Sequence, residues 1–214
     1  SQKDSAIHNL ELVEGYNTLQ QINYYKQAWQ LTGAYWNYYT LSIPPIGTYT
    51  LEKPQPVPVS LGEFNTKYVI SPYPLTDKRF SLENKFGEYF LYRNTSYLPR
   101  AYFQTDDQKP GNEAKILEYN PNFIKVDTLS RQSSRLVLAE VWSPGWNAYL
   151  NGKEKVNVQE KPNTLRLVDI RHDTQFVDFK YEPDTFKIGQ AITLTTVFLI
   201  SAYFFARWRR LVNS

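Results

Sequence analysis

The chain has 214 residues, a formal net charge of +3 and a mean hydropathy of −0.52, which is the composition of a mostly soluble chain. This small charge excludes the concentrated basic surface that nucleic-acid binding requires, so no nucleic-acid partner is expected. With no cysteine and two histidines, the chain can form neither disulfides nor thiolate metal sites, and no cofactor is expected within it.

Residues 1–112 are predicted to form a small α+β subdomain. The segment 10–14 alternates apolar and acidic side chains, as a short strand would. Asn17 is a suitable helix N-cap, and apolar and aromatic residues then recur near helical spacing. We therefore expect a helix over 18–36 that ends near Gly33.

A proline-rich stretch, residues 41–59, separates this helix from three β-rich runs. Prolines remove backbone donors and favour an extended chain that runs over the surface. The runs 66–71, 80–84 and 89–93 predict a small antiparallel meander. Asn94 begins an Asn-Thr-Ser sequence that fits the N-glycosylation pattern, but the pattern is common by chance and carries no weight.

Residues 113–185 have a denser rhythm of short strands, which predicts an antiparallel β-sandwich. The expected strands cover residues 114–119, 123–129, 135–142, 146–150, 155–159, 164–170 and 175–181. Asn151 and Gly152 separate two of them and predict a two-residue hairpin turn, because both residues tolerate positive φ. Pro183 closes the last strand shortly before an apolar span, so the sandwich should sit on the membrane surface.

The apolar span runs from Ile188 to Ala206, contains no Asp, Glu, Lys or Arg, and is long enough to cross a bilayer. We expect a transmembrane helix over 186–208, with Ser and Thr hydroxyls bonded back to the preceding turn. The arginines of 207–210 mark the cytoplasmic side and make 209–214 a cytoplasmic tail. The alternative, a buried helix of a soluble core, would usually show a polar face, and none is visible.

The expected fold class is therefore mainly β. It combines a small α+β N-terminal part, an antiparallel β-sandwich ectodomain outside the cytoplasm and one C-terminal transmembrane helix. The sequence contains no signal peptide that would explain the export of this ectodomain, so we expect the C-terminal piece of a longer protein of the cell membrane.

Five blocks of the sequence carry a resemblance to a known family. They are Glu14–Leu19 with Tyr24 and Tyr25, Asn65–Ile70, Tyr92–Phe103, Ala139–Lys153 and Val177–Pro183. In this order they resemble motifs of the bacterial YfhO-like membrane proteins, whose SExYYPGWKAYVDGK motif is similar to AEVWSPGWNAYLNGK here. The blocks extend over nearly the whole chain. Thr18 stands where the family usually has proline and Thr66 where it often has valine, so any role for these two positions stays open.

The resemblance implies a large multi-pass protein similar to GT-C glycosyltransferases. Such a protein takes a sugar from a polyprenyl-phosphate carrier outside the membrane and adds it to a cell-envelope polymer. Its catalytic acidic residue would lie in an early extracytoplasmic loop outside this chain, which is then an accessory domain. The expected partners are the lipid bilayer, the upstream transmembrane region, the lipid-linked sugar and the envelope polymer. A divalent cation would serve only the full-length enzyme.

Seven residues are candidates for substrate binding: Glu14, Gly15, Tyr16, Asn17, Arg100, Trp142 and Trp146. In the turn 14–17, glycine allows close approach, tyrosine offers a stacking face, and asparagine can start a helix whose amides suit an anion. The glutamate of this turn, like Glu140, could be the carboxylate of a transferase site, or it could cap or pair locally.

Arg100 and the two tryptophans each have a functional and a structural interpretation. A guanidinium can clamp a phosphate of the anionic carrier, or it can form an ion pair that braces the two halves of the ectodomain. Trp142 and Trp146 flank a Pro-Gly pair and could stack on a sugar, although a tryptophan beside a tight turn more often packs in the core.

Two other functions were weighed against the transferase. A non-enzymatic β-sandwich that binds envelope glycan or a partner protein stays open, and the sequence upstream of Ser1 would separate the two interpretations. A hydrolase is disfavoured, because the chain has no Gly-x-Ser-x-Gly motif and because His8 and His172 lie in polar stretches.

Overall fold

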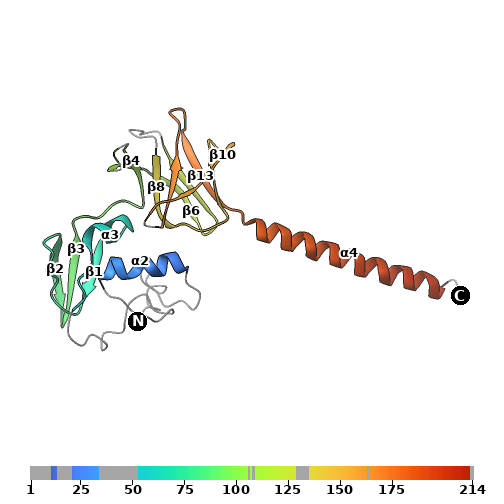
Figure 1. Cartoon of the computed structure of the whole chain (residues 1–214), viewed down its shortest axis with the longest axis horizontal. Helices are drawn as coiled ribbons and strands as arrows, with labels where there is room; N and C mark the ends of the chain where they lie inside the picture. Colours follow the sequence, from blue (N-terminus) through green and yellow to red (C-terminus); the bar gives the residue numbers. More distant parts are fainter. Residues whose placement is uncertain are drawn as a thin grey trace.

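A computed structural model describes residues 11–13, 21–33, 53–105, 107, 109–128, 135–162 and 164–212 of the chain. These residues form three antiparallel sheets, two short helices and one long C-terminal helix (Figure 1). The predicted fold class is confirmed: the chain is mainly β, with a sandwich followed by one apolar helix.

Two five-stranded sheets form the sandwich. The β8 sheet has the order β11-β12-β8-β4-β5, and the β13 sheet has the order β10-β9-β13-β7-β6. Their strands are β4 (Ala101–Gln104), β5 (Pro110–Glu113), β6 (Ile116–Asn120), β7 (Phe123–Asp127), β8 (Arg135–Val141), β9 (Trp146–Leu150), β10 (Glu154–Val156), β11 (Gln159–Glu160), β12 (Leu165–Asp169) and β13 (Phe176–Tyr181). Between the sheets, side chains such as Phe103, Val126, Leu136, Val177 and Phe179 make a fully buried core.

The sandwich differs from the prediction in its extent and in one crossover. It includes β4, which precedes the expected boundary between residues 112 and 113, and β5, which crosses it. The single strand expected over 155–159 is two strands, β10 and β11, which belong to opposite sheets. The chain therefore crosses from one sheet to the other at Asn157 and Val158, and Val158 is buried in the core on the way.

The predicted Asn-Gly turn joins β9 to β10. Asn151 and Gly152 both have positive φ, +51° and +71°, and the Lys153 amide closes the turn by donating to the Leu150 carbonyl at 3.1 Å. The strand register pairs Leu150 with Glu154, so three residues rather than two separate the paired positions. The chemistry of the turn was predicted correctly, and the length of the loop was not.

The N-terminal part contains two helices and a small sheet. Its elements are α2 (Ile22–Thr32), α3 (Pro58–Glu63), β1 (Tyr68–Ser71), β2 (Phe80–Phe86) and β3 (Tyr89–Asn94). The α2 helix ends at Thr32, and Gly33 follows it with a φ of +70°, which confirms the predicted end near Gly33. The sheet order is β1-β3-β2, so the predicted meander is wrong: β3 lies in the centre.

A second core joins this part to the outer face of the β8 sheet. Tyr102, Val137 and Leu165 from that sheet pack with Leu31 of α2 and Leu61 of α3. The β8 sheet is thus covered on both faces, which explains why β4 is buried at every position and why β12 is buried over Leu165–Val168.

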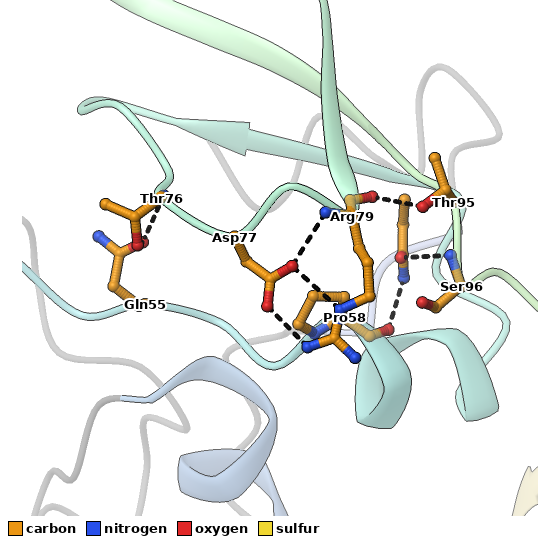
Figure 2. A network of polar contacts seen from close by, with 8 residues as sticks. Gln55, Pro58, Thr76, Asp77, Arg79, Thr95 and Ser96 are labelled. Carbon is orange, nitrogen blue, oxygen red and sulfur yellow. Dashed lines mark hydrogen bonds and ion pairs between the residues drawn. The ribbon is translucent and has the colours of Figure 1, made fainter.

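Polar contacts fix the loops around β2 and α3, as Figure 2 shows. Arg79 donates to both carboxylate oxygens of Asp77, at 3.0 and 2.7 Å, and this pair lowers the pKa of Asp77 to about 2. The Asn94 side chain is 1% exposed, and its amide nitrogen donates to the carbonyls of Pro58 and Thr66. Asn94 is therefore not accessible for glycosylation in the folded protein.

The C-terminal helix α4 (Asp184–Val212) extends away from the sandwich (Figure 1). Its segment Asp184–Arg209 is long and apolar enough to span a membrane, and none of it is buried in the protein. The hydroxyls of Thr193, Thr195 and Thr196 donate to the carbonyls four residues earlier, as predicted. Its exposed apolar surface argues against a helix of a soluble core and is consistent with a membrane anchor.

Candidate functional site

The junction with α4 lies at one end of the sandwich, which we call the α4 end. Two turns lie there beside the last residues of β13. The Tyr181 amide donates to the Asn122 carbonyl at 3.0 Å, and the Glu182 amide donates to the Gly145 carbonyl at 2.7 Å. Gly145 has a φ of +100°, and a Cβ at this position would lie 3.0 Å from Pro183. The turn therefore depends on glycine for its conformation and for its close contact with the junction.

The Glu182 carboxylate strengthens this junction. It accepts a hydrogen bond from the Tyr149 hydroxyl at 2.6 Å and a second from the Asn147 side-chain amide at 3.2 Å. The bond from Tyr149 is the main reason that the pKa of Glu182 lies below its ordinary value. Both donors come from β9, so the residue before Pro183 is fixed to the sheet rather than held in a free linker.

Trp146 is at the centre of the α4 end. The centroid of its ring lies 5.5 Å from the centroid of the Tyr181 ring. The guanidinium carbon of Arg166 lies 3.8 Å from the centroid of the Trp146 ring. A guanidinium stacked at this distance gains from the negative face of the indole. Trp146 belongs to the β13 sheet and Arg166 to the β8 sheet, so this contact connects the two layers.

Arg166 is an unusual residue for a strand interior, since its side chain is buried and charged. The residue is 5% exposed, and its Nε donates to the Val141 carbonyl at 3.1 Å. Its Nη1 atom is buried and has no hydrogen-bond partner among the described residues. Burial lowers the pKa of Arg166 to about 10, and the nearby Glu140 carboxylate offsets part of this effect. The group is still a cation at neutral pH.

Arg100 lies just before β4 and contacts three side chains. Its Nη1 donates to Oε1 of Glu11 at 3.0 Å, and its Nη2 donates to Oε2 of the same carboxylate. Its Nε lies 3.6 Å from Oε1 of Glu140, and its guanidinium carbon lies 4.9 Å from the centroid of the Tyr119 ring. The fork of this arginine is thus occupied by a carboxylate in the described structure.

Tyr119 and Glu140 complete the arrangement across the two sheets. The Tyr119 hydroxyl donates to Oε1 of Glu140 at 2.8 Å. Burial, assisted by this hydrogen bond, raises the pKa of Tyr119 to about 12, so the hydroxyl remains a donor under all ordinary conditions. We call the set of Arg100, Tyr119, Glu140, Trp146 and Arg166 the two-arginine cluster.

The cluster offers two cations, one internal carboxylate and two aromatic faces at the α4 end. Such a set can hold an anion or a sugar, and it contains no nucleophile with an adjacent base. Within the part of the chain that the structure describes, no three His, Cys, Asp or Glu residues gather as a metal site would require.

Three of the predicted site residues lie at or next to the cluster. Arg100 and Trp146 belong to it. Trp142 packs against the sandwich core, and its indole nitrogen donates to the Val158 carbonyl at 2.9 Å, which agrees with the structural interpretation. The turn formed by Glu14, Gly15, Tyr16 and Asn17 lies outside the described residues.

Sequence reasoning missed Arg166, Tyr119 and the partner carboxylate Glu11. Arg166 gave no usable signal, because an arginine between Leu165 and Leu167 is typical of the solvent face of an alternating strand, whereas the structure buries both faces of β12. The pairing of Glu11 with Arg100 spans 89 positions and leaves no local trace in the sequence.

Comparison of the chain with protein-family models, with curated proteins and with solved structures gives no match.

Proposed function

We propose that this chain is the C-terminal extracytoplasmic accessory domain and last membrane helix of a glycosyltransferase that uses polyprenyl-phosphate-linked sugar and acts on cell-envelope polymers. One observation carries the proposal. Residues from three of the family-like blocks meet at the α4 end: Arg100 from one, Glu140 and Trp146 from the next, and Tyr181 from the last. Their convergence beside the apolar helix supports a shared role at the membrane surface.

The chemistry of the donor suits this place. A polyprenyl-phosphate sugar presents its anionic phosphate and its sugar ring at the membrane surface, directly above its lipid tail. Arginine recognises phosphate through its planar fork, and tryptophan stacks on sugar rings. The domain would hold and orient the carrier or the acceptor, while the proton transfer and any divalent cation belong to the upstream part of the parent protein.

The proposed orientation places the sandwich outside the cytoplasm and the end of α4 inside. Its support is the charge-free span followed by the arginines from Arg207 onward. A cysteine introduced by Ser214→Cys in the full-length protein should remain unlabelled by a membrane-impermeant thiol reagent in intact cells and react after permeabilisation. Labelling in intact cells would contradict the orientation.

The function is tested with the full-length protein in cells. A strain without the gene receives either the native protein or the variant Arg166→Met, and sugar transfer from the polyprenyl carrier to the envelope polymer is measured beside the amount of folded protein in the membrane. We expect transfer to be lost without the gene and reduced about tenfold or more in the variant at equal protein level. Unchanged transfer in the strain without the gene would refute the transferase.

A second candidate function is a non-enzymatic binding module, and one observation favours it. The small sheet exposes apolar side chains on its free surface, among them Tyr68, Ile70, Phe86 and Tyr89. Exposed apolar groups that lie together often mark a contact with another protein. If the strain without the gene keeps full sugar transfer but loses a membrane complex that copurifies with the native protein, this candidate replaces the first.

A further inference from the structure

The ion pair between Glu11 and Arg100 joins groups with very different environments. The Arg100 side chain is 22% exposed, whereas the Glu11 side chain is 67% exposed. The two hydrogen bonds run in parallel from the guanidinium fork to the two carboxylate oxygens. Phosphate binds arginine through the same bidentate geometry, and with more charge. The same fork would therefore suit a phosphate group in place of the carboxylate.

The charges of the cluster favour an anion at this position. Arg100 and Arg166 are both cations, and within the cluster Glu140 is the one carboxylate that balances their charge. The Tyr119 hydroxyl donates a hydrogen bond to this carboxylate. The second negative charge comes from Glu11, which the chain supplies from outside the sandwich. Without Glu11 the two arginines would exceed the internal carboxylate by one positive charge.

The cluster is also not fully satisfied by the described protein groups. The buried Nη1 of Arg166 has no partner among the described residues, although buried polar atoms nearly always find one. An unpaired buried donor on a cation is costly, and an additional nearby negative charge would offset part of that cost. The exposed Glu11 carboxylate contributes no hydrogen bond to Arg166 in the structure.

Glu11 is well placed to be exchanged. An ion pair with one largely exposed partner is weak, because water competes for the carboxylate. Close to Glu11, the Tyr24 hydroxyl of α2 donates to the Val13 carbonyl, so this segment keeps a separate attachment if the carboxylate leaves. Exchange of the anion therefore does not require the helix to detach.

We propose that Glu11 holds the place of a phosphate group on Arg100, and that a phosphate monoester or diphosphate displaces it at the α4 end of the sandwich. The position next to the membrane helix makes a lipid headgroup one source of this group, and free phosphate in solution is the other. The phosphate group would be the anion that the proposed function requires, and Glu11 would be its competitor within the chain. This proposal rests on the proposed function only for the identity of the lipid.

The test measures anion binding by the full chain in phosphatidylcholine nanodiscs. The probes are inorganic pyrophosphate in solution and, in a second arm, nanodiscs that also contain phosphatidic acid. Glu11→Gln removes the competing charge and should tighten pyrophosphate binding about two- to fivefold, the range that corresponds to the loss of an exposed ion pair. Adding Arg100→Lys to this variant should weaken binding about tenfold, because lysine lacks the fork.

A matched control exists in the same chain. Asp77→Asn frees Arg79 from an exposed bidentate pair that resembles the one at Arg100 but has no second arginine in contact with it among the described residues. This variant should leave pyrophosphate binding unchanged. If Glu11→Gln fails to fold, Glu11→Ala serves in its place, since it also removes the competing charge and the Glu11 side chain is largely exposed.

The outcomes separate the possibilities. Tighter binding of pyrophosphate by the Glu11 variant supports the proposal with phosphate itself as the ligand, and a gain seen only with phosphatidic acid supports it with a lipid headgroup as the source. Unchanged or weaker binding in both arms overturns it, as does an equal gain from Asp77→Asn. Because no sugar transfer is measured, the binding proposal can fail while the transferase function stands, and the reverse also holds.

Discussion

Replacing Gly145 with alanine should destabilise the junction between the sandwich and α4. Gly145 has a φ of +100°, a conformation that residues with a side chain rarely adopt. The new Cβ would lie 3.0 Å from the Cα and Cβ atoms of Pro183 and 3.0 Å from the ring of Tyr181. The backbone cannot retreat freely, because the Gly145 carbonyl accepts the 2.7 Å hydrogen bond from Glu182.

The size of the effect follows from these two contributions. Holding a residue with a side chain in an unfavourable backbone region costs about 1–3 kcal/mol. Overpacking a closely packed contact adds about 1–3 kcal/mol, and here the nearest atoms belong partly to a proline backbone that gives little. We therefore expect Gly145→Ala to lower the free energy of unfolding by roughly 2–6 kcal/mol in total.

A second glycine in the chain separates the two contributions. Gly87 has a φ of +60°, and a Cβ there would meet no atom within 4 Å. Gly87→Ala should therefore show only the backbone contribution, about 1–2 kcal/mol. The difference between the two variants reports the contact of the turn with Pro183 and Tyr181.

The assay is urea unfolding of the full chain in detergent micelles, followed by tryptophan fluorescence and by hydrogen exchange of β9 and β13. We expect Gly145→Ala to increase exchange in these two strands, and Gly87→Ala to leave them unchanged. If both alanine variants lower the free energy of unfolding by the same amount, the close packing at the junction is not a source of stability and the reasoning is refuted.

Three further predictions concern single contacts. Gly152→Val should lower the free energy of unfolding by about 1–3 kcal/mol, because valine resists the positive φ of the turn; an unchanged urea midpoint would contradict this. The Asp77 carboxyl should titrate near pH 2 by NMR, and Arg79→Gln should return it toward 3.8. Since the folded pKa is the lower one, the pair stabilises the fold above about pH 4 and this contribution is lost as the pH falls toward 2; a midpoint near 3.8 in the native protein would disprove it. Tyr149→Phe should raise the pKa of Glu182, because its main hydrogen-bond donor is removed, and an NMR titration that shows no change would contradict this.

Much of the fold could be predicted because its elements have local signals. Alternation of apolar residues located most strands of the sandwich, positive-φ chemistry located the turn at Asn151, and a charge-free run located α4. Strand order has no such signal: alternation shows which face is apolar and not which strand lies beside it, so the central place of β3 was missed. Residues 110–113 were also missed, because their polar, exposed Pro-Gly-Asn-Glu sequence is typical of a loop.

The candidate site was predicted only in part, because single residues have local signals and contacts between strands do not. Arg100 and Trp146 stand out locally, as residue types that bind anions and sugars. What makes them a cluster is the packing of two sheets, which brings Tyr119 to Glu140 and Arg166 to Trp146. Such contacts depend on the register and the spacing of the layers, and neither can be derived from periodicity.

The fastening of Glu182 to β9 has a mechanical consequence for a protein in a bilayer. A transmembrane helix tilts when its apolar length exceeds the local hydrocarbon thickness. At ~1.5 Å per residue, α4 is a stiff rod that matches or exceeds the ~30 Å hydrocarbon core. Because hydrogen bonds fix Glu182 to β9 just before α4, a change in tilt of an α4 that spans a bilayer would swing the sandwich sideways above the lipid headgroups. In that setting, membrane thickness would determine where the α4 end lies over the bilayer.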